Sequence, residues 1–203
     1  MLTRVAVLVS GGGTNLQALI DAQAAGRLGS GKIALVISNR KAAYALERAK
    51  NAGIERAVLS KYMKPDPDDY DAALLDMLRT HGIDMIALAG FLGIIGPKVL
   101  AAYEGRIVNI HPALIPSFCG MGYYGLRVHE AALARGVKVT GATAHLVNGE
   151  VDGGPILLQK AVEVQPDDTP ETLQRRVMEQ AEWEILPRAV RMISDQISNG
   201  RMN

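Results

Sequence analysis

Residues 4–15 read RVAVLVSGGGTN, and this stretch decides the fold class. A run of small and branched apolar residues is followed by a serine and three glycines, which is typical of a strand buried on both faces that ends in a tight turn. The residues that follow place Leu16, Leu19 and Ile20 at helical spacing. The stretch therefore predicts a buried strand over residues 4–10, a glycine turn and a helix.

The alternation of strand and helix continues through the first half of the chain. Expected strands lie at residues 32–38, 56–59, 85–89 and 106–110, and expected helices at 15–25, 42–51 and 68–81. Parallel strands need crossover connections, which are usually helices. This rhythm therefore predicts a doubly wound parallel α/β sheet.

The pattern changes after His111. A loop rich in Gly, Pro and Tyr precedes further elements, namely a helix at 127–135, strands at 138–147 and 155–164, and a last helix from about 169 to 198. Pro187 is expected to kink or break that helix. The expected fold is α/β: a Rossmann-like, doubly wound, mainly parallel sheet with C-terminal antiparallel strands and a long terminal helix.

Composition excludes several classes of protein. At about 150 residues per domain, 203 residues favour a single domain, and 48% apolar residues exclude intrinsic disorder as the main state. Lys and Arg number 22 against 21 Asp and Glu, and only 4% of residues are aromatic. Neither a polyanion-binding surplus nor a stacking surface is indicated, so we expect no nucleic-acid partner.

Cysteine use and hydropathy indicate the compartment. Cys119 is the single cysteine, which excludes an internal disulfide and multi-cysteine zinc sites and favours a reducing environment. The sequence has no apolar run of about 20 residues for a membrane span and no signal-peptide pattern. We therefore expect a cytoplasmic protein with no membrane partner.

The glycine turn is the first candidate site. In open α/β sheets, ligands bind beyond the carboxyl ends of the strands, which places residues 10–15, 90–93 and 109–112 at one edge. Backbone N–H groups at a helix start suit a phosphate, and Thr14 and Asn15 can add side-chain donors. No Lys-Ser/Thr pair follows, and no third glycine completes a dinucleotide fingerprint. A monophosphate or sugar phosphate is the favoured ligand, with a plain flexible turn as the alternative.

Asn109 and His111 form the second candidate. Two residues apart in a strand, they share one face, where an amide and an imidazole suit a developing oxyanion. Asp152, in a glycine-rich connection, can tune an imidazole or move a proton. The alternatives are a hydrogen-bonded strand end and an ordinary turn aspartate. His145 is expected either to face the same cleft or to lie in the core.

Other polar residues have plainer interpretations. We expect His129 to be a capping or ligand-loop residue at the start of a helix, and Trp183 to be core. Cys119 is interpreted as an inert free thiol. The histidines lack metal-ligand spacing, so no metal is expected.

Five motifs together resemble the phosphoribosylglycinamide formyltransferase family, in that family's order and spacing. They are SGGGTNLQAL at 10–19, LAGFLGII at 88–95, NIHPALIPSF at 109–118, GVKVTGATAHLV at 136–147 and VDGGPILLQ at 151–159. The resemblance implies one formyltransferase domain over residues 1–203, with a phosphate-binding Rossmann-like half at 1–111 and a folate-side half at 112–203. It also implies small-molecule substrates and a monomer or homodimer.

The resemblance implies roles for individual residues. Asn109, His111 and Asp152 would be catalytic, Gly12, Gly13, Thr14 and Asn15 would hold the substrate phosphate, and Glu182 would contact the ribose. The co-substrate would be 10-formyltetrahydrofolate, bound by Phe91, Leu92, Gly93, Ile94, Ile95, Arg106, Val147 and Val151. Relatives often carry an arginine where this chain has Gly93, so a cation of the donor site is missing there.

The implied reaction is formyl transfer from 10-formyltetrahydrofolate to the amine of 5-phosphoribosylglycinamide in purine biosynthesis. We expect Asn109 and a protonated His111 to stabilise the oxyanion, with Asp152 keeping His111 charged. Two alternatives are a formyltetrahydrofolate hydrolase and a sugar-phosphate sensor without turnover.

Overall fold

A computed structural model describes residues 2–200 and shows seven strands in one sheet. The strands are β1 Thr3–Val9, β2 Gly31–Ser38, β3 Glu55–Val58, β4 Met85–Leu88, β5 Ile107–His111, β6 Val139–Leu146 and β7 Ile156–Glu163. Their order is β3-β2-β1-β4-β5-β6-β7. The first five run parallel, whereas β6 and β7 pair antiparallel, as the sequence predicts.

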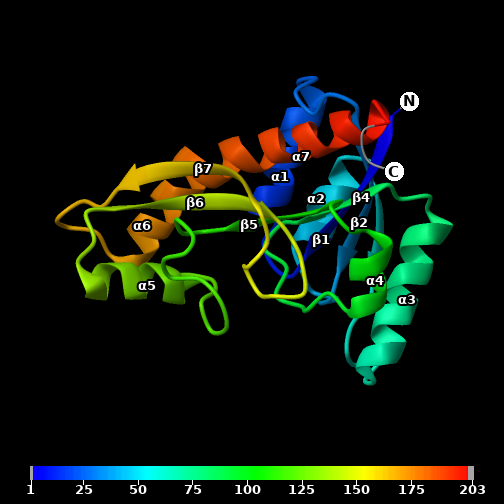
Figure 1. Cartoon of the computed structure of the whole chain (residues 1–203), viewed down its shortest axis with the longest axis horizontal. Coiled ribbons are helices and arrows are strands. Elements are labelled where there is room, and N and C mark those ends of the chain that lie inside the picture. The colour runs from blue at the N-terminus through cyan, green and yellow to red at the C-terminus, as the bar shows by residue number, and fades with distance from the viewer. Residues whose placement is uncertain (1, 201–203) are drawn as a thin grey trace.

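Helices cover both faces of this sheet (Figure 1). They are α1 Thr14–Ala24, α2 Ala45–Asn51, α3 Pro67–Thr80, α4 Pro97–Ala102, α5 Leu126–Arg135, α6 Pro170–Val177 and α7 Trp183–Ser198, with a π-helix, η1 Met178–Glu182, between the last two. α3 and α4 lie on one face, and α1 and α7 lie on the other.

Strand β1 explains why two layers of helices are needed. Val5, Val7 and Val9 pack into one core with residues of α1 and α7, while Ala6 and Leu8 pack into the other core with residues of α3 and α4. Successive side chains of a strand point to opposite faces, so the apolar run Val5–Val9 must be covered on both faces of the sheet.

The C-terminal helix differs from the expectation. Pro187 lies inside α7 and does not break it, and the irregularity comes earlier, at η1. A π turn holds one residue more than an α turn and is frequent at functional sites. The short helix α4 is also new, and its free N–H groups at Lys98 and Val99 donate to the carboxylate of buried Asp71. No helix within residues 2–200 is both long and apolar enough to span a membrane.

Candidate active site

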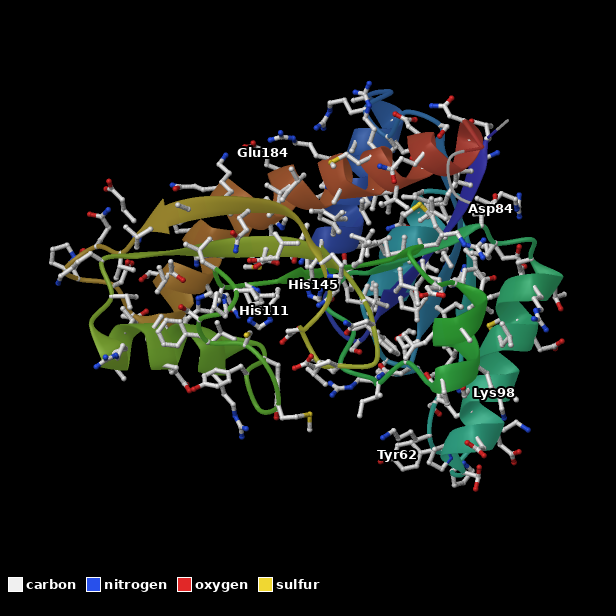
Figure 2. All side chains as sticks on the ribbon, in the orientation of Figure 1. Tyr62, Asp84, Lys98, His111, His145 and Glu184 are labelled. Carbon is white, nitrogen blue, oxygen red and sulfur yellow. The ribbon has the colours of Figure 1, made fainter. Side chains whose placement is uncertain are left out.

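A cleft of about 830 Å³ opens at the carboxyl ends of β1, β4 and β5. All three segments predicted to meet at this edge line it, together with the β6–β7 connection and the loop over residues 112–125. His111 and His145 lie close together there (Figure 2). The topology therefore gathers most of the candidate residues into one cavity.

The glycine turn is braced from α2. Arg48 Nε donates to the carbonyl of Gly12 at 2.8 Å, and Ala45 N–H donates to the carbonyl of Gly11 at 3.1 Å. Gly13 precedes α1 with φ of 73°, and a Cβ atom there would lie 2.6 Å from the Cβ of Ala45. Only glycine fits such a position. The first N–H groups of α1 have no carbonyl partner within the helix and are available to an anion beside the turn.

The side chain of Asn15 does not serve this anion site in the way we predicted. It is buried, and its Nδ2 donates to Glu182 Oε2 at 2.6 Å. Thr14 likewise turns its hydroxyl toward Met178 Sδ, at 3.7 Å. Both side chains therefore contact η1 rather than standing free beside the turn.

Glu182 lies on η1 and lines the cleft, as its predicted ribose role requires. It is 5% exposed. Burial raises the pKa of its carboxyl group to about 7, and the hydrogen bond from Asn15 opposes that rise. Near neutral pH this group is therefore poised between its neutral and charged forms.

A cluster of polar side chains spans β5, β6 and the β6–β7 connection. Asp152 Oδ2 lies 3.5 Å from His111 Nδ1, and Asp152 Oδ1 lies 3.6 Å from His145 Nε2. Asn109 pairs with His145 across the antiparallel ladder, and their side chains meet at 3.1 Å between Nδ2 and Nε2. The predicted trio comes together, and His145 is a fourth member.

The sequence left two locations open for the side chain of His145, the cleft and the core. The antiparallel pairing of β6 with β5 decides between them, because the cross-strand partner of a residue shares its face. Its Nδ1 lies 2.8 Å from the carbonyl oxygen of Leu146 and acts as the donor there. Nε2 is then left to accept a hydrogen bond from Asn109.

The protonation of His111 contradicts our expectation. Its Nε2 donates to the carbonyl of Phe118 at 2.8 Å. Burial lowers the pKa of His111, and the nearby Asp152 carboxylate and the Phe118 hydrogen bond offset only part of that effect. The imidazole is therefore neutral at neutral pH in the free protein, with its proton on Nε2 and its Nδ1 lone pair toward Asp152.

Asp152 is the charged member of the pair. Burial alone would raise the pKa of its carboxyl group, but the adjacent His145 and the hydrogen bond from Gly120 N–H bring it below the ordinary value. Its backbone adopts φ of 57°, and Phe118 adopts φ of 51°. Non-glycine residues are uncommon in this region, and such conformations gather at active sites.

The residues predicted on the folate side line the same cleft, with one exception. Phe91, Leu92, Gly93, Ile94, Ile95, Val147 and Val151 all border the cavity. Leu92, Ile94 and Val151 are at least 45% exposed there, which leaves an open apolar wall. A Cβ at Gly93 would lie 2.6 Å from ring atoms of Phe91, so the ring occupies the space that a larger residue would need.

Arg106 is the exception, and its predicted place in the donor pocket is wrong. It directly precedes β5, at the end of that strand opposite His111. Its guanidinium donates to the carbonyls of Asp84 and Ala102 and stacks over Tyr103. A strand carries its two ends to opposite edges of the sheet, so a residue before β5 cannot reach the cleft beyond it.

The cleft is also lined by residues that were not among the predicted site residues. Arg40 follows β2 beside the glycine turn and is exposed.

His129 is neither a cap nor a loop residue: it is fully buried inside α5. Burial, with a smaller effect of His111, lowers its pKa to about 4. Tyr123 and Tyr124 bring aromatic surface from the loop over residues 112–125. Within residues 2–200, no three His, Cys, Asp or Glu side chains are placed to hold a metal ion.

Comparison with known proteins agrees with the fold. The family model for formyl transferases matches residues 3–190. A phosphoribosylglycinamide formyltransferase from Haemophilus influenzae is 41% identical, over 96% of this chain and 88% of its own. The crystal structure of glycinamide ribonucleotide transformylase 1 from Symbiobacterium toebii aligns with a TM-score of 0.89 and 43% identity, over 96% of this chain and 88% of its own.

A second solved structure gives the same result. Phosphoribosylglycinamide formyltransferase from Brucella melitensis aligns with a TM-score of 0.87 and 38% identity, over 96% of each chain. Because the family model spans almost the whole chain and full-length relatives share about two residues in five, this chain belongs to the formyl transferase family.

Proposed function

We propose that this enzyme transfers the formyl group of 10-formyltetrahydrofolate to the amine of 5-phosphoribosylglycinamide. The products are formylglycinamide ribonucleotide and tetrahydrofolate, a step of de novo purine biosynthesis. One observation carries the proposal: a single cleft is lined by a braced anion-binding turn, by the Asn109–His111–Asp152 cluster and by an open apolar wall. Membership of the formyl transferase family supports it.

The phosphorylated substrate would bind along the first half of the chain. Its phosphate would accept hydrogen bonds from the backbone at Gly12, Gly13, Thr14 and Asn15 at the start of α1. Arg40 is the only lysine or arginine among the described residues that line the cleft, and its charge favours an anion. Glu182 would accept hydrogen bonds from the ribose hydroxyls.

The folate would lie against the apolar wall. Phe91 and the exposed side chains of Leu92, Ile94 and Val151 offer a surface for a flat ring system. Burying such surface is favourable by about 25 cal/mol per Å² of apolar area. Val147 and Ile95 complete this wall.

The chemistry needs no nucleophile from the protein. The substrate amine attacks the formyl carbon, a new C–N bond forms, and a tetrahedral oxyanion results. Asn109 Nδ2 uses one hydrogen on His145 and has a second to donate to the oxyanion. The bond from the formyl carbon to the folate nitrogen N10 then breaks, and a proton lost by the amine must reach N10.

The neutral His111 beside charged Asp152 suits that proton transfer. The Nδ1 lone pair of His111 and the carboxylate of Asp152 face each other at 3.5 Å, and the pair can accept one proton between them. A histidine that becomes protonated beside Asp152 is stabilised by the carboxylate. The pair would therefore take the proton from the amine and return it to N10.

A formyl-transfer assay tests the proposal. Purified protein is mixed with a 10-formyl folate, with and without the ribonucleotide, and deformylated folate is followed by absorbance. We expect release that depends on the ribonucleotide. Release of equal rate without it would instead identify a hydrolase, and binding of sugar phosphates without any release would identify a sensor.

We further propose a cytoplasmic location, which the free thiol of Cys119 supports because a reducing compartment maintains free thiols.

A further inference from the structure

The contact between Asn15 and Glu182 joins two parts of the cleft that lie 167 positions apart in the chain. Asn15 belongs to the first turn of α1, and Glu182 ends the π-helix η1. Thr14 makes a second contact between the same two elements, through Met178. The anion-binding turn and the carboxyl group predicted to bind ribose are therefore one connected unit.

The side-chain amide of Asn15 is held in place by this contact with Glu182. The residue is 7% exposed, and its Oδ1 is buried without a hydrogen-bond partner in the described part of the chain. A buried polar atom without a partner is costly, so a side chain that tolerates one must be held by its other interactions. The short hydrogen bond from Nδ2 to the Glu182 carboxyl group is the one that holds it.

Glu182 depends on Asn15 in turn. Asn15 is the only hydrogen-bond partner of its carboxyl group within residues 2–200. The elements packed against η1 are α6, α7, β6 and β7, and no charged side chain on them is among the causes that shift the pKa of Glu182. Without the amide, nothing in the described residues would orient the carboxyl group or favour its charged form.

We propose that Asn15 is a positioning residue whose side-chain amide holds the Glu182 carboxylate toward the ribose, so that recognition of the ribose is coupled to the turn that binds the phosphate. This inference rests on the proposed function, since it concerns the ribonucleotide half of the cleft. The ionised carboxylate can accept a hydrogen bond from Asn15 on one oxygen and hydrogen bonds from ribose hydroxyls on the other. In the protonated carboxyl group, one of these two oxygens carries a proton and is a poorer acceptor. Asn15 therefore acts through Glu182, and its backbone N–H keeps its separate role toward the phosphate.

Four variants test the coupling: Asn15→Leu, Asn15→Asp, Glu182→Gln and the double variant Asn15→Asp/Glu182→Gln. A hydrogen bond to a charged group justifies an expected rise of about 10- to 100-fold in the KM for the ribonucleotide in Asn15→Leu. The KM for the folate in the same variant is the internal control and should change little. Asn15→Asp places two carboxyl groups in contact and should be worse, while the double variant restores an amide–carboxyl pair with its direction reversed and should recover part of the loss.

A second readout needs no substrate. The pH dependence of folding stability reports the ionisation of Glu182: the parent chain should lose stability above about pH 4.5, and this loss should end near pH 7. Because the amide favours the charged form, Asn15→Leu should move the upper end of this range to higher pH, and Glu182→Gln should remove the loss. The two proposals can therefore fail separately: a parent chain without ribonucleotide-dependent transfer overturns the proposed function, whereas an unmoved upper end of this pH range in Asn15→Leu overturns the positioning role.

Two kinetic results would also overturn the role of Asn15. One is an equal rise of both KM values in Asn15→Leu, which would indicate collapse of the whole cleft. The other is an effect of Asn15→Leu that is the same in the Glu182→Gln background as in the parent chain, which would show that the two side chains do not act together.

Discussion

Glu182→Gln should make the folded protein more stable relative to the parent chain as the pH rises. The parent carboxyl group is buried, which raises its pKa from the ordinary 4.5 to about 7. Below pH 4.5 the group is protonated in both the folded and the unfolded chain, so it carries no penalty. Between pH 4.5 and 7 the unfolded chain releases the proton and the folded chain retains it, so stability is lost as the pH rises.

The size of this effect follows from the two pKa values. A difference of about 2.5 units corresponds to about 3 kcal/mol, since each unit is about 1.4 kcal/mol. Glutamine keeps the shape of the side chain and an oxygen that accepts from Asn15, but it has no charge to bury. The difference between variant and parent should therefore grow by about 3 kcal/mol from pH 4.5 to 7 and stay level above that range.

Urea denaturation of both proteins across pH 4 to 8.5 measures this difference. Glu179→Gln is the matched control, because Glu179 lies on the same π-helix but is exposed to solvent. The difference in unfolding free energy between Glu179→Gln and the parent should not grow by about 3 kcal/mol between pH 4.5 and 7. A difference between Glu182→Gln and the parent that stays flat through this range would show that Glu182 is not the buried, proton-retaining group described above.

Three further substitutions have expected outcomes. Gly13→Ala should lower the free energy of unfolding by about 1–2 kcal/mol because of its left-handed backbone, and the clash of the new Cβ with Ala45 should lower it further. Gly12→Ala should cost less, because its Cβ would meet no atom within 4 Å. Equal losses for the two variants in chemical denaturation would contradict the role of Gly13. Asp152→Asn should lower kcat by about 10²–10⁴-fold, as loss of an acid–base group does, and a near-normal kcat in steady-state assays would remove Asp152 from the chemistry. Arg106→Gln should cost about 1 kcal/mol of stability through the lost hydrogen bonds and leave the KM for the folate unchanged, so a selective rise of that KM would restore Arg106 to the donor site.

The sheet could be predicted from the sequence because its signals are local. An unbroken apolar run such as Val5–Val9 of β1 reveals that both faces of the strand are buried, and the glycines at 11–13 mark the turn at its carboxyl end. The same logic placed Asn109 and His111 on one face at the same edge, where both line the cleft. The comparisons confirm the predicted family and fold.

Features that depend on distant parts of the chain could not be predicted in this way. Asn15 turns toward Glu182 because η1 lies beside the start of α1, a contact that no local pattern encodes. His111 is neutral because burial outweighs the attraction of Asp152, and burial depends on how the loop that carries Phe118 closes over the ring. Arg106 was misplaced because sequence proximity to a catalytic strand does not say at which end of the strand a residue lies.

The fate of the formyl carbon tests the central claim most directly. A 10-formyl folate labelled with ¹³C in the formyl group is incubated with the protein and excess 5-phosphoribosylglycinamide, and the label is followed by NMR. The label should appear in the amide of the formylated ribonucleotide, with little in formate. Label that accumulates as formate at the same rate with and without the ribonucleotide would contradict formyl transfer.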